Sequence, residues 1–359
     1  MKIVLEFFGI SDGPICGVDL SSSAIKILQI TKRGDKLIVT NYGIQSLMPG
    51  VIKDKKIIDP DAVVKAIKEV VRKSKITTKK VCIAIPSANA ITKVIQVEGD
   101  ANDRDIGNEI LLEAEKHIPY PVTEVCLDYE VIKQEGNKSG KKDVVLAACK
   151  AEDIAERIAI FKRADLDVEI VDIESFALQR AFGLVTKLLP DTGKNKVVGL
   201  VDIGSNVTSL NIFYNNSVIY ARDQNFSGSQ ILDQIQSRYG LTLQEALSAR
   251  QRNELPEDFV TEILEPFKES VVSQINRACQ FFLSSANVQA IDYLFLTGGV
   301  TVVAGLDESI QSTIGVKTFI ANPLLNMNCL DSDLQQVLLD DSALLMTCCG
   351  LALRNVIDK

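Results

Sequence analysis

Residues 17–30, GVDLSSSAIKILQI, and residues 200–213, LVDIGSNVTSLNIF, follow one pattern and decide the fold of this chain. Each is an apolar strand that ends in an aspartate, Asp19 or Asp202, followed by small polar residues and a second apolar strand. A turn and a further strand follow in both copies, at 36–45 and 217–226. Two copies of one β-unit predict two pseudo-equivalent lobes, each with its own core.

The rest of the chain alternates helices with strands. Its 359 residues are too many for one ordinary core, so two lobes are also expected from length. Apolar residues at helical spacing predict helices at 59–75, 153–164, 174–189, 229–239, 243–252 and 259–285. Short apolar runs predict buried strands at 80–85, 168–173 and 292–296. This alternation predicts an α/β layer architecture.

Residues 89–150 have no counterpart in the second half and are interpreted as a small inserted α+β subdomain. Its expected elements are strands at 92–97, 125–133 and 144–149, a helix at 105–117 and an exposed hairpin tip at 136–142. The predicted division is therefore a first lobe at 1–88 and 151–195, the insertion at 89–150, a second lobe at 196–228 and 290–359, and a helical or mixed subdomain at 229–289.

Composition excludes several classes of function. The net charge of −8 disfavours duplex nucleic acid or anionic lipid as the principal partner. The single histidine, His117, rules out a Ser-His-Asp triad and zinc sites built on histidine. Eight cysteines without a CxxC pair indicate free thiols in a reducing compartment.

The apolar start at 1–10 is short and contains Glu6, and no apolar run reaches the length of a membrane span. We therefore expect a soluble cytoplasmic protein without a signal peptide.

The two small-residue loops have the chemistry of a phosphate site. A triphosphate needs backbone N–H groups and small hydroxyls without side-chain bulk. Residues 21–23 (Ser-Ser-Ser) and 204–206 (Gly-Ser-Asn) supply these groups, and Lys26 or Thr208 adds a donor. Asp19 and Asp202 are expected to hold Mg²⁺, largely through water, since Mg²⁺ prefers one or two carboxylates together with phosphate oxygens.

A third loop, Thr297-Gly298-Gly299-Val300, follows the strand at 292–296. Two glycines allow the backbone to approach a flat ligand closely, which suits the adenosine part of a nucleotide.

Two aspartate loops followed by a Gly-Gly loop, in this order, resemble the actin and sugar-kinase superfold. The resemblance narrows to the type IV pilus assembly protein PilM family in four segments that a sugar kinase does not need. These are EAEKHIPYPVTEVCLDY (113–129), NRACQFFLSS (276–285), ANPLLNM (321–327) and CGLALRN (349–355). The resemblance implies an actin-like, ribonuclease-H-like duplicated, bilobal fold. It also implies an inserted subdomain of the kind called 1C, as in the related FtsA. The lobes would then be subdomains 1A and 2A, with 229–289 as 2B.

The resemblance further implies an ATP-binding scaffold in pilus assembly. It would dock the short cytoplasmic N-terminal peptide of the inner-membrane protein PilN between 1A and 1C, and would lie at the inner face of the membrane through this partner. The resemblance leaves open whether the protein forms a homo-oligomer or a ring. The nucleotide residues it implies are Asp19, Ser21, Ser22, Ser23, Lys26, Gly204, Ser205, Asn206, Thr208, Gly298, Gly299, Val300 and, near the adenine, Arg250. Residues expected to line the groove, or to form the subdomain core, are Ile118, Tyr120, Val125, Leu127 and Tyr129.

Hydrolysis is a separate question. Glu174, at the start of a helix, and Asp202 are the candidate catalytic carboxylates. Glu174 also fits as a first-turn residue favoured by the helix dipole. The first loop has no glycine, which favours slow or absent hydrolysis.

Three alternatives remain: a type II secretion platform component, an FtsA-like filament protein and a small-molecule kinase of the same superfold. The kinase is disfavoured because no loop between Gly34 and Pro86 is polar enough to build a sugar site. The FtsA-like protein is disfavoured because the chain stops soon after its last core helix, without an amphipathic C-terminal helix.

Overall fold

The structure is a computed structural model that describes residues 14–98, 103–132, 141–252, 254–286, 288–330 and 335–356. The chain forms two compact units. Unit 1 is Met1–Arg180, Met327–Ser332 and Thr347–Lys359, and unit 2 is Ala181–Asn326 and Asp333–Met346. The sequence-based division gave all of 290–359 to the second lobe, whereas the structure assigns two C-terminal segments to unit 1.

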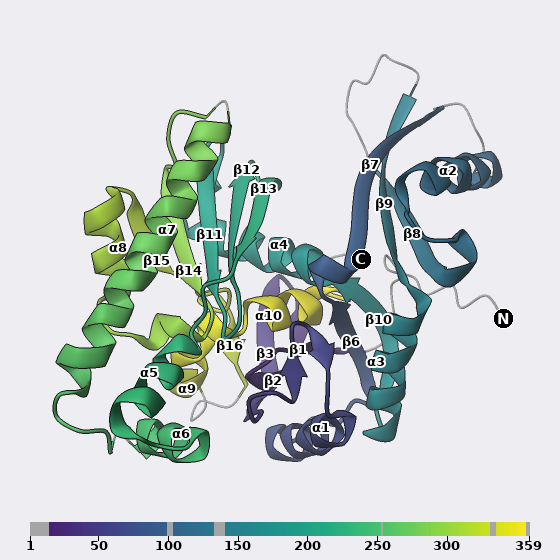
Figure 1. The fold of residues 1–359 in the computed structure, drawn as a ribbon. Helices are drawn as coiled ribbons and strands as arrows, with labels where there is room; N and C mark the ends of the chain where they lie inside the picture. Colours follow the sequence, from purple (N-terminus) through teal and green to yellow (C-terminus); the bar gives the residue numbers. More distant parts are fainter. Residues whose placement is uncertain are drawn as a thin grey trace. The chain divides into compact units, whose positions relative to one another are not determined.

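Unit 1 is built on a six-stranded sheet with the order β10-β6-β1-β2-β3-β16 (Figure 1). The strands are β1 (Cys16–Leu20), β2 (Ala24–Arg33), β3 (Lys36–Ser46), β6 (Lys80–Ile85), β10 (Asp167–Ile173) and β16 (Asn328–Cys329). The first three form an antiparallel meander, and β1, β6 and β10 run parallel. The pairing of β16 with β3 explains why residues 327–332 belong to this unit.

Helices cover this sheet. They are α1 (Pro60–Ser74), α3 (Ala151–Arg163), α4 (Glu174–Val185) and α10 (Met346–Leu353). The carboxylate of Asp59 caps α1 by accepting from the Ala62 N–H at 3.0 Å, and a proline at the first helical position favours the same start. Val63, Ile67 and Val70 of α1 are fully buried in the core.

The C-terminal helix α10 contacts β1 and α4 at two glycines. A Cβ on Gly17 would lie 2.4 Å from the Ala352 nitrogen, and a Cβ on Gly350 would lie 1.7 Å from the Ala177 carbonyl oxygen. Only glycine permits such close backbone contact. These two contacts place the C-terminal segment in unit 1.

Residues inserted between β6 and α3 form a three-stranded antiparallel sheet with the order β7-β9-β8. Its elements are β7 (Ala90–Glu98), α2 (Asp103–His117), β8 (Val125–Val131) and β9 (Lys141–Lys150). Ile110 and Ala114 of α2 pack on Ile95 and Leu146 of the sheet. The predicted helix and three strands are confirmed, while the hairpin tip predicted at 136–142 falls mostly outside the described residues.

Unit 2 is built on a five-stranded sheet with the order β13-β12-β11-β14-β15. The strands are β11 (Val197–Ile203), β12 (Thr208–Tyr214), β13 (Ser217–Gln224), β14 (Tyr293–Thr297) and β15 (Lys317–Ile320). The helices are α5 (Gln230–Tyr239), α6 (Leu243–Arg252), α7 (Glu265–Ser285), α8 (Leu306–Ile314) and α9 (Gln335–Asp340). Buried Phe267, Val271, Ile275 and Phe282 of α7 fill the core.

The predicted duplication is confirmed strand by strand. In both units a three-stranded meander pairs in parallel with a later strand, β1 with β6 and β11 with β14. Even the register agrees, since Asp19 lies opposite Lys26 and Asp202 lies opposite Ser209. Among the described residues, no helix combines the length and the apolar character that a membrane span requires.

Candidate nucleotide-binding loops

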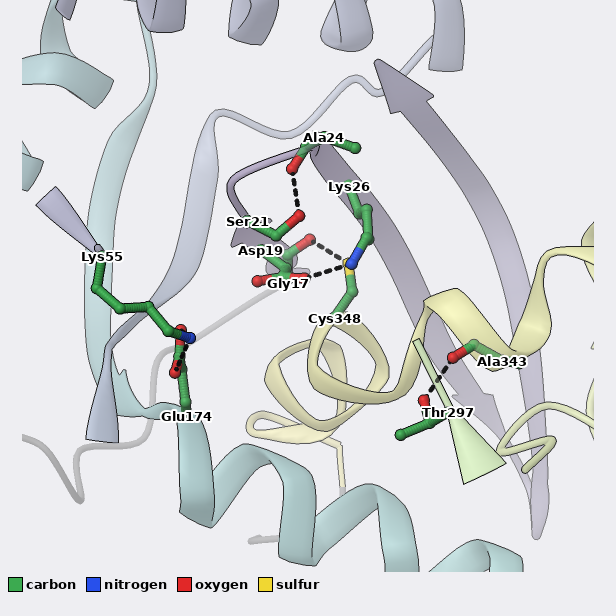
Figure 2. A network of polar contacts seen from close by, with 10 residues as sticks. All are labelled: Gly17, Asp19, Ser21, Ala24, Lys26, Lys55, Glu174, Thr297, Ala343 and Cys348. Carbon is green, nitrogen blue, oxygen red and sulfur yellow. Dashed lines mark hydrogen bonds and ion pairs between the residues drawn. The ribbon is translucent and has the colours of Figure 1, made fainter. Parts of the chain in front are cut away.

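The first loop connects β1 to β2 and closes on itself. Both the backbone N–H and the hydroxyl of Ser21 donate to the Ala24 carbonyl, at 3.0 and 2.8 Å (Figure 2). The Ser23 carbonyl accepts from the Leu47 N–H at 2.8 Å, which ties the loop to the segment after β3. Ser22 is half-buried and Ser23 is exposed, so the tight turn presents two small polar residues at its outer side.

Lys26 neutralises Asp19 in this loop. The Lys26 ammonium lies 3.0 Å from Asp19 Oδ2, and the two side chains are 14% and 9% exposed (Figure 2). An ion pair with so little solvent around it is screened weakly. Lys26 was predicted as a phosphate donor, and the structure shows it bound to the carboxylate that was predicted to face the metal.

A buried thiol binds the strand that leads into this loop. Cys348 of α10 donates to the Gly17 carbonyl at 3.3 Å (Figure 2). Burial, together with the nearby Asp19 charge, raises the pKa of the Cys348 thiol well above its ordinary value, so this group stays a neutral donor. The C-terminal helix therefore fixes the strand that carries Asp19.

The second loop connects β11 to β12 and is held by the start of α5. The Gly204 N–H donates to the Val207 carbonyl at 3.0 Å. The N–H groups of Gly228 and Ser229 donate to the carbonyls of Gly204 and Ser205, at 2.8 and 3.0 Å. These hydrogen bonds to its carbonyls hold the loop in one conformation.

Thr208 stands at the exit of the second loop with a buried hydroxyl that bonds to no partner among the described residues. Its side chain is 4% exposed. A buried hydroxyl without a partner is uncommon in a folded protein and calls for an explanation, such as a ligand.

The third loop lies directly on the second. Gly298 has φ +94°, and a Cβ there would come within 2.5 Å of both Asp202 Oδ1 and the Ile203 carbonyl oxygen. Only glycine fits both the backbone angle and the space. By contrast, a Cβ on Gly299 would meet nothing within 4 Å, so this position is open.

Two hydrogen bonds anchor the third loop. The Thr297 hydroxyl donates to the Ala343 carbonyl at 2.5 Å (Figure 2). The Gly298 N–H donates to the same oxygen at 3.2 Å. Val300 is buried behind the loop. Within unit 2, Gly298 thus lies against Asp202 and Ile203, the residues that lead into the loop at Gly204.

Arg250 is separate from this group. It lies on α6, and it has no hydrogen bond or ion pair with the three loops among the described residues. Its guanidinium is partly buried, which lowers the pKa. Its predicted role near an adenine ring stays a prediction.

The Glu174 carboxylate is bound by a lysine that was not among the predicted site residues. The Lys55 ammonium donates to both oxygens of Glu174, at 3.0 and 3.3 Å (Figure 2). Lys55 lies in the turn between β4 (Ile52–Lys53) and β5 (Lys56–Ile57), where Asp54 and Lys55 both have positive φ. Two-residue strands carry no periodic signal, so no sequence pattern pointed to this lysine.

The predicted groove residues divide into a buried and an exposed class. Ile118 is buried in the core of the inserted subdomain, and Val125, Leu127 and Tyr129 pack against that core partly buried. Tyr120 is 41% exposed, and the Lys150 ammonium lies 4.7 Å from its ring centre. Of the five, Tyr120 is the residue whose side chain is most open to a partner.

Comparison with known proteins identifies the family. A sequence profile described as type IV pilus assembly protein PilM matches residues 17–356, nearly the whole chain. The structure is also similar to a solved PilM–PilN type IV pilus biogenesis complex. The TM-score is 0.75 at 22% identity, covering 95% of this chain and 98% of that chain.

Two further solved structures share the fold at lower similarity. The ethanolamine utilization protein EutJ from Carboxydothermus hydrogenoformans gives a TM-score of 0.57 at 14% identity, covering 98% of this chain and 93% of that chain. A nucleotide-free diol dehydratase-reactivating factor gives 0.53 at 10% identity, with 95% and 99% covered. The match of the profile to almost every described residue decides the assignment: the chain belongs to the type IV pilus assembly protein PilM family.

Proposed function

We propose that this protein is an ATP-binding scaffold of type IV pilus assembly that docks the N-terminal cytoplasmic peptide of a PilN-like membrane protein. Family membership supports the pilus assignment. The similar solved structure is a complex of PilM with PilN, which supports the choice of partner. The observation that carries the nucleotide proposal is the matched register of the two aspartate hairpins. In unit 2, the Gly298 loop also lies against the second of these hairpins.

The proposed nucleotide site uses all three loops. Residues 21–23 and 204–206 would donate backbone N–H groups to the phosphates, and the loop at Gly298 and Gly299 would lie against the nucleoside. Lys26 would exchange its contact with Asp19 for a phosphate oxygen, because a doubly charged phosphate attracts the ammonium more strongly than one carboxylate. The Thr208 hydroxyl, buried without a partner among the described residues, would gain one.

Mg²⁺ fits the donor set in the proposal. Asp19 and Asp202 are the next-to-last residues of equivalent strands. Among the described residues, no group of three or more carboxylate, thiol or imidazole side chains is placed to hold a metal alone. Such a set suits Mg²⁺ carried by phosphate oxygens and water. The bound ion would neutralise charge between the triphosphate and the two carboxylates.

Slow or absent hydrolysis is part of the proposal. A carboxylate that orients water must be able to accept its proton or hydrogen bond. The Lys55 ammonium occupies both oxygens of Glu174, which leaves that carboxylate poorly placed for the role.

Nucleotide binding is tested by thermal unfolding with Mg-ATP. At a hundred times its Kd, a ligand that binds only the folded state adds about 2.7 kcal/mol, which in a chain of this size is roughly 5 to 10 °C in Tm. Asp202→Ala should remove the shift, and Asp35→Ala, at an exposed turn aspartate, should keep it. A full shift in the Asp202 variant would exclude the second loop from the site.

Partner docking is tested with a fluorescent peptide from the N-terminus of a PilN-like protein. Truncating a half-exposed aromatic anchor typically costs 1–2 kcal/mol, so Tyr120→Ala should weaken binding about tenfold. Tyr214→Ala is the matched control, since Tyr120 and Tyr214 are each 41% exposed. A larger loss with the Tyr214 variant would place the peptide on unit 2 and contradict the proposal.

A further inference from the structure

The outer strand of the unit 2 sheet, β13 (Ser217–Gln224), has an open edge. It is the terminal strand in the order β13-β12-β11-β14-β15, and it pairs with β12 on its inner side. Among the described residues, 217–224 make no further backbone hydrogen bond. A row of unpaired N–H and C=O groups along an edge strand is a template for pairing with another strand.

The duplication of the fold provides a comparison for this edge. β13 is the third strand of its meander, as β3 is in unit 1. The outer edge of β3 is paired, because β16 lies parallel to it, opposite Ile38 and Val39. An added strand at this edge is thus compatible with the meander, and in the described part of unit 2 the equivalent edge has none.

A bulge limits the stretch of β13 that another strand can pair with. The pairing with β12 shifts register between Ile212 and Phe213, which leaves Ile219 without an opposite residue. A bulge interrupts a ladder locally and protects that part of an edge. Beyond the bulge, residues 220–224 pair with β12 in continuous register, so a regular open edge remains there.

Helix α7 lies beside one face of this edge. The ring centres of Tyr220 and Phe282 are 5.1 Å apart, and the Arg222 guanidinium lies 4.0 Å from the centre of the Phe281 ring. Since side chains alternate along a strand, Tyr220 and Arg222 share the face toward α7. A strand added about 4.8 Å beyond β13 would bring every second side chain to this face, next to Arg222 and Phe281.

The exposed residues of α7 at this place have no role in the core. Residues 276–285, NRACQFFLSS, are one of the segments on which the family resemblance rests, and the buried members of this segment fill the core of unit 2. Phe281 is 49% exposed, and Arg277, one helical turn earlier, is also exposed. Residues four apart share one face of a helix, so Arg277 extends the surface formed by Phe281 and Arg222.

Both cations of this surface lack an acidic partner. Unit 2 contains several ion pairs, but among the described residues none includes Arg222 or Arg277. The acidic residue next to Arg222 in sequence is Asp223, which points to the opposite face of the strand and accepts from the Ser209 hydroxyl at 2.6 Å. The acidic residue nearest to Arg277 in sequence is Glu269, about two helical turns away. Both guanidinium groups can therefore receive carboxylates from a partner.

We propose that β13 docks an extended segment of another protein, which adds a strand along residues 220–224. On the face toward α7, an apolar side chain of this segment packs on Phe281, and acidic side chains before and after it pair with Arg222 and Arg277. Main-chain hydrogen bonds provide affinity, and the alternating side chains provide specificity.

Charge selects the class of partner. In a second copy of this chain, antiparallel pairing of 220–224 with itself would place the two Arg222 side chains opposite each other, and like charges in that position are destabilising. An acidic segment meets the same arginines with the opposite charge. This surface differs from the three loops and from Tyr120, so the proposal goes beyond the function proposed above.

The first test is an anisotropy titration at low salt of the full chain with the fluorescein-labelled peptide TETLTET, whose two Glu and one Leu share one face of a strand. TETSTET, which keeps the charges but lacks the apolar side chain, should bind at least about tenfold more weakly.

N-methylation of TETLTET tests the added strand itself. Successive residues of a strand direct their N–H groups to opposite edges, so methylating the Glu and Leu nitrogens blocks one edge and methylating the two inner Thr nitrogens blocks the other. One of these peptides should lose binding, and the other should bind within about threefold of the parent peptide.

The second test changes the protein at exposed positions, where thermal unfolding should show an unchanged Tm. Arg222→Glu and Arg277→Glu should each weaken binding of TETLTET at least about fivefold. Lys317→Glu is the matched control, because Lys317 lies on the opposite edge strand β15 with its ammonium 5.2 Å from the Phe319 ring centre. It should leave binding within about twofold.

Phe281→Ser should weaken binding at least about tenfold, whereas Val260→Ser, at a side chain of equal exposure, should leave it within about twofold. No binding of TETLTET at about 1 mM protein, equal binding of the two N-methylated peptides, or equal effects of Arg222→Glu and Lys317→Glu would each overturn the proposal. A dimer of the unmodified chain in sedimentation that Arg222→Glu abolishes would assign the edge to a second copy and would overturn it as well.

Discussion

At the scale of the residue, the two adjacent glycines of the third loop differ in whether a side chain would fit. Gly298 combines φ +94° with a Cβ position only 2.5 Å from Asp202 Oδ1, while the Cβ position of Gly299 is open. Gly298→Ala should therefore lower the free energy of unfolding by about 2 kcal/mol or more and displace Asp202. Gly299→Ala should change it by less than about 0.5 kcal/mol.

Urea unfolding of the two variants measures this difference, and Mg-ATP titration shows whether Asp202 is still in place. Equal stability of the two variants would mean that Gly298 is not in close contact with Asp202 and Ile203.

A second residue-scale feature is the buried carboxylate of Asp172. It is 1% exposed, accepts from Arg180 Nη1 at 3.0 Å and lies 3.8 Å from Arg354 Nε. Arg180 also donates to the Gly350 carbonyl at 2.9 Å. One aspartate thus holds two arginines, and through them the C-terminal segment of unit 1.

Removing that aspartate should be severe. Asp172→Ala removes the buried carboxylate that the two guanidinium groups share, and loss of one member of a buried ion pair typically costs about 3–5 kcal/mol. Asp167→Ala, at an exposed position of the same strand β10, should cost less than about 0.5 kcal/mol. Chemical denaturation of both variants is the measurement, and a small loss for Asp172→Ala would show that the arginines find other partners.

At the scale of the element, the β4–β5 hairpin controls a candidate catalytic group. Its turn residue Lys55 binds Glu174 at the start of α4, and the Lys55 carbonyl accepts from Arg157 at 3.4 Å. Burial lowers the pKa of the Arg157 guanidinium. The hairpin is therefore fixed by contacts to two helices, and Glu174 is fixed with it.

Releasing Glu174 should raise ATP turnover. Lys55→Met frees the carboxylate to act on water, and a general base typically contributes about 10²–10⁴-fold, so phosphate release should rise by at least about tenfold. The double variant Lys55→Met with Glu174→Gln should return to the original rate, and Lys53→Met, exposed on β4, should not change it. An unchanged rate in the Lys55 variant would remove Glu174 from the catalytic candidates.

Element prediction from sequence succeeded where the periodic signal was long. Helix α6 and strand β6 were predicted with both ends correct, and α1 and β14 were predicted within one residue at each end. Strands β4, β5 and β16 contain two residues each, too few for alternation to register. The pairing of β16 with β3 joins segments far apart in sequence, a tertiary relation that no local pattern reports.

The site shows the same division. The sequence indicated Asp19, Asp202 and Gly298 because loop composition is local. It did not indicate that Lys26 binds Asp19 or that Lys55 binds Glu174, since side-chain partners depend on the folded geometry.

At the scale of the whole molecule, buried thiols make the fold sensitive to alkali. Burial raises the pKa of Cys149 and of Cys279 from an ordinary 9.0 to about 12. The unfolded chain therefore releases these protons first as pH rises, and stability present below pH about 9 should fall between pH 9 and 12. Thermal unfolding across this range should show the decline, while a flat profile would contradict it.

The same burial predicts thiol reactivity. Seven cysteines are buried and Cys329 is partly exposed. A thiol reagent at pH 8 should therefore modify about one of the eight rapidly in the native protein and all eight after denaturation. Rapid modification of several in the native state would show that the cores of the units are less tightly packed than described.

The most direct test of the account is amide hydrogen exchange of the whole protein with and without Mg-ATP. Under the proposed function, Mg-ATP contacts the loops of both aspartate hairpins and the Gly298 loop, so exchange should slow at residues 20–24, 204–208 and 298–301. Helix α2 (Asp103–His117) should be unchanged. Protection in one loop only, or in none at saturating Mg-ATP, would contradict the central claim.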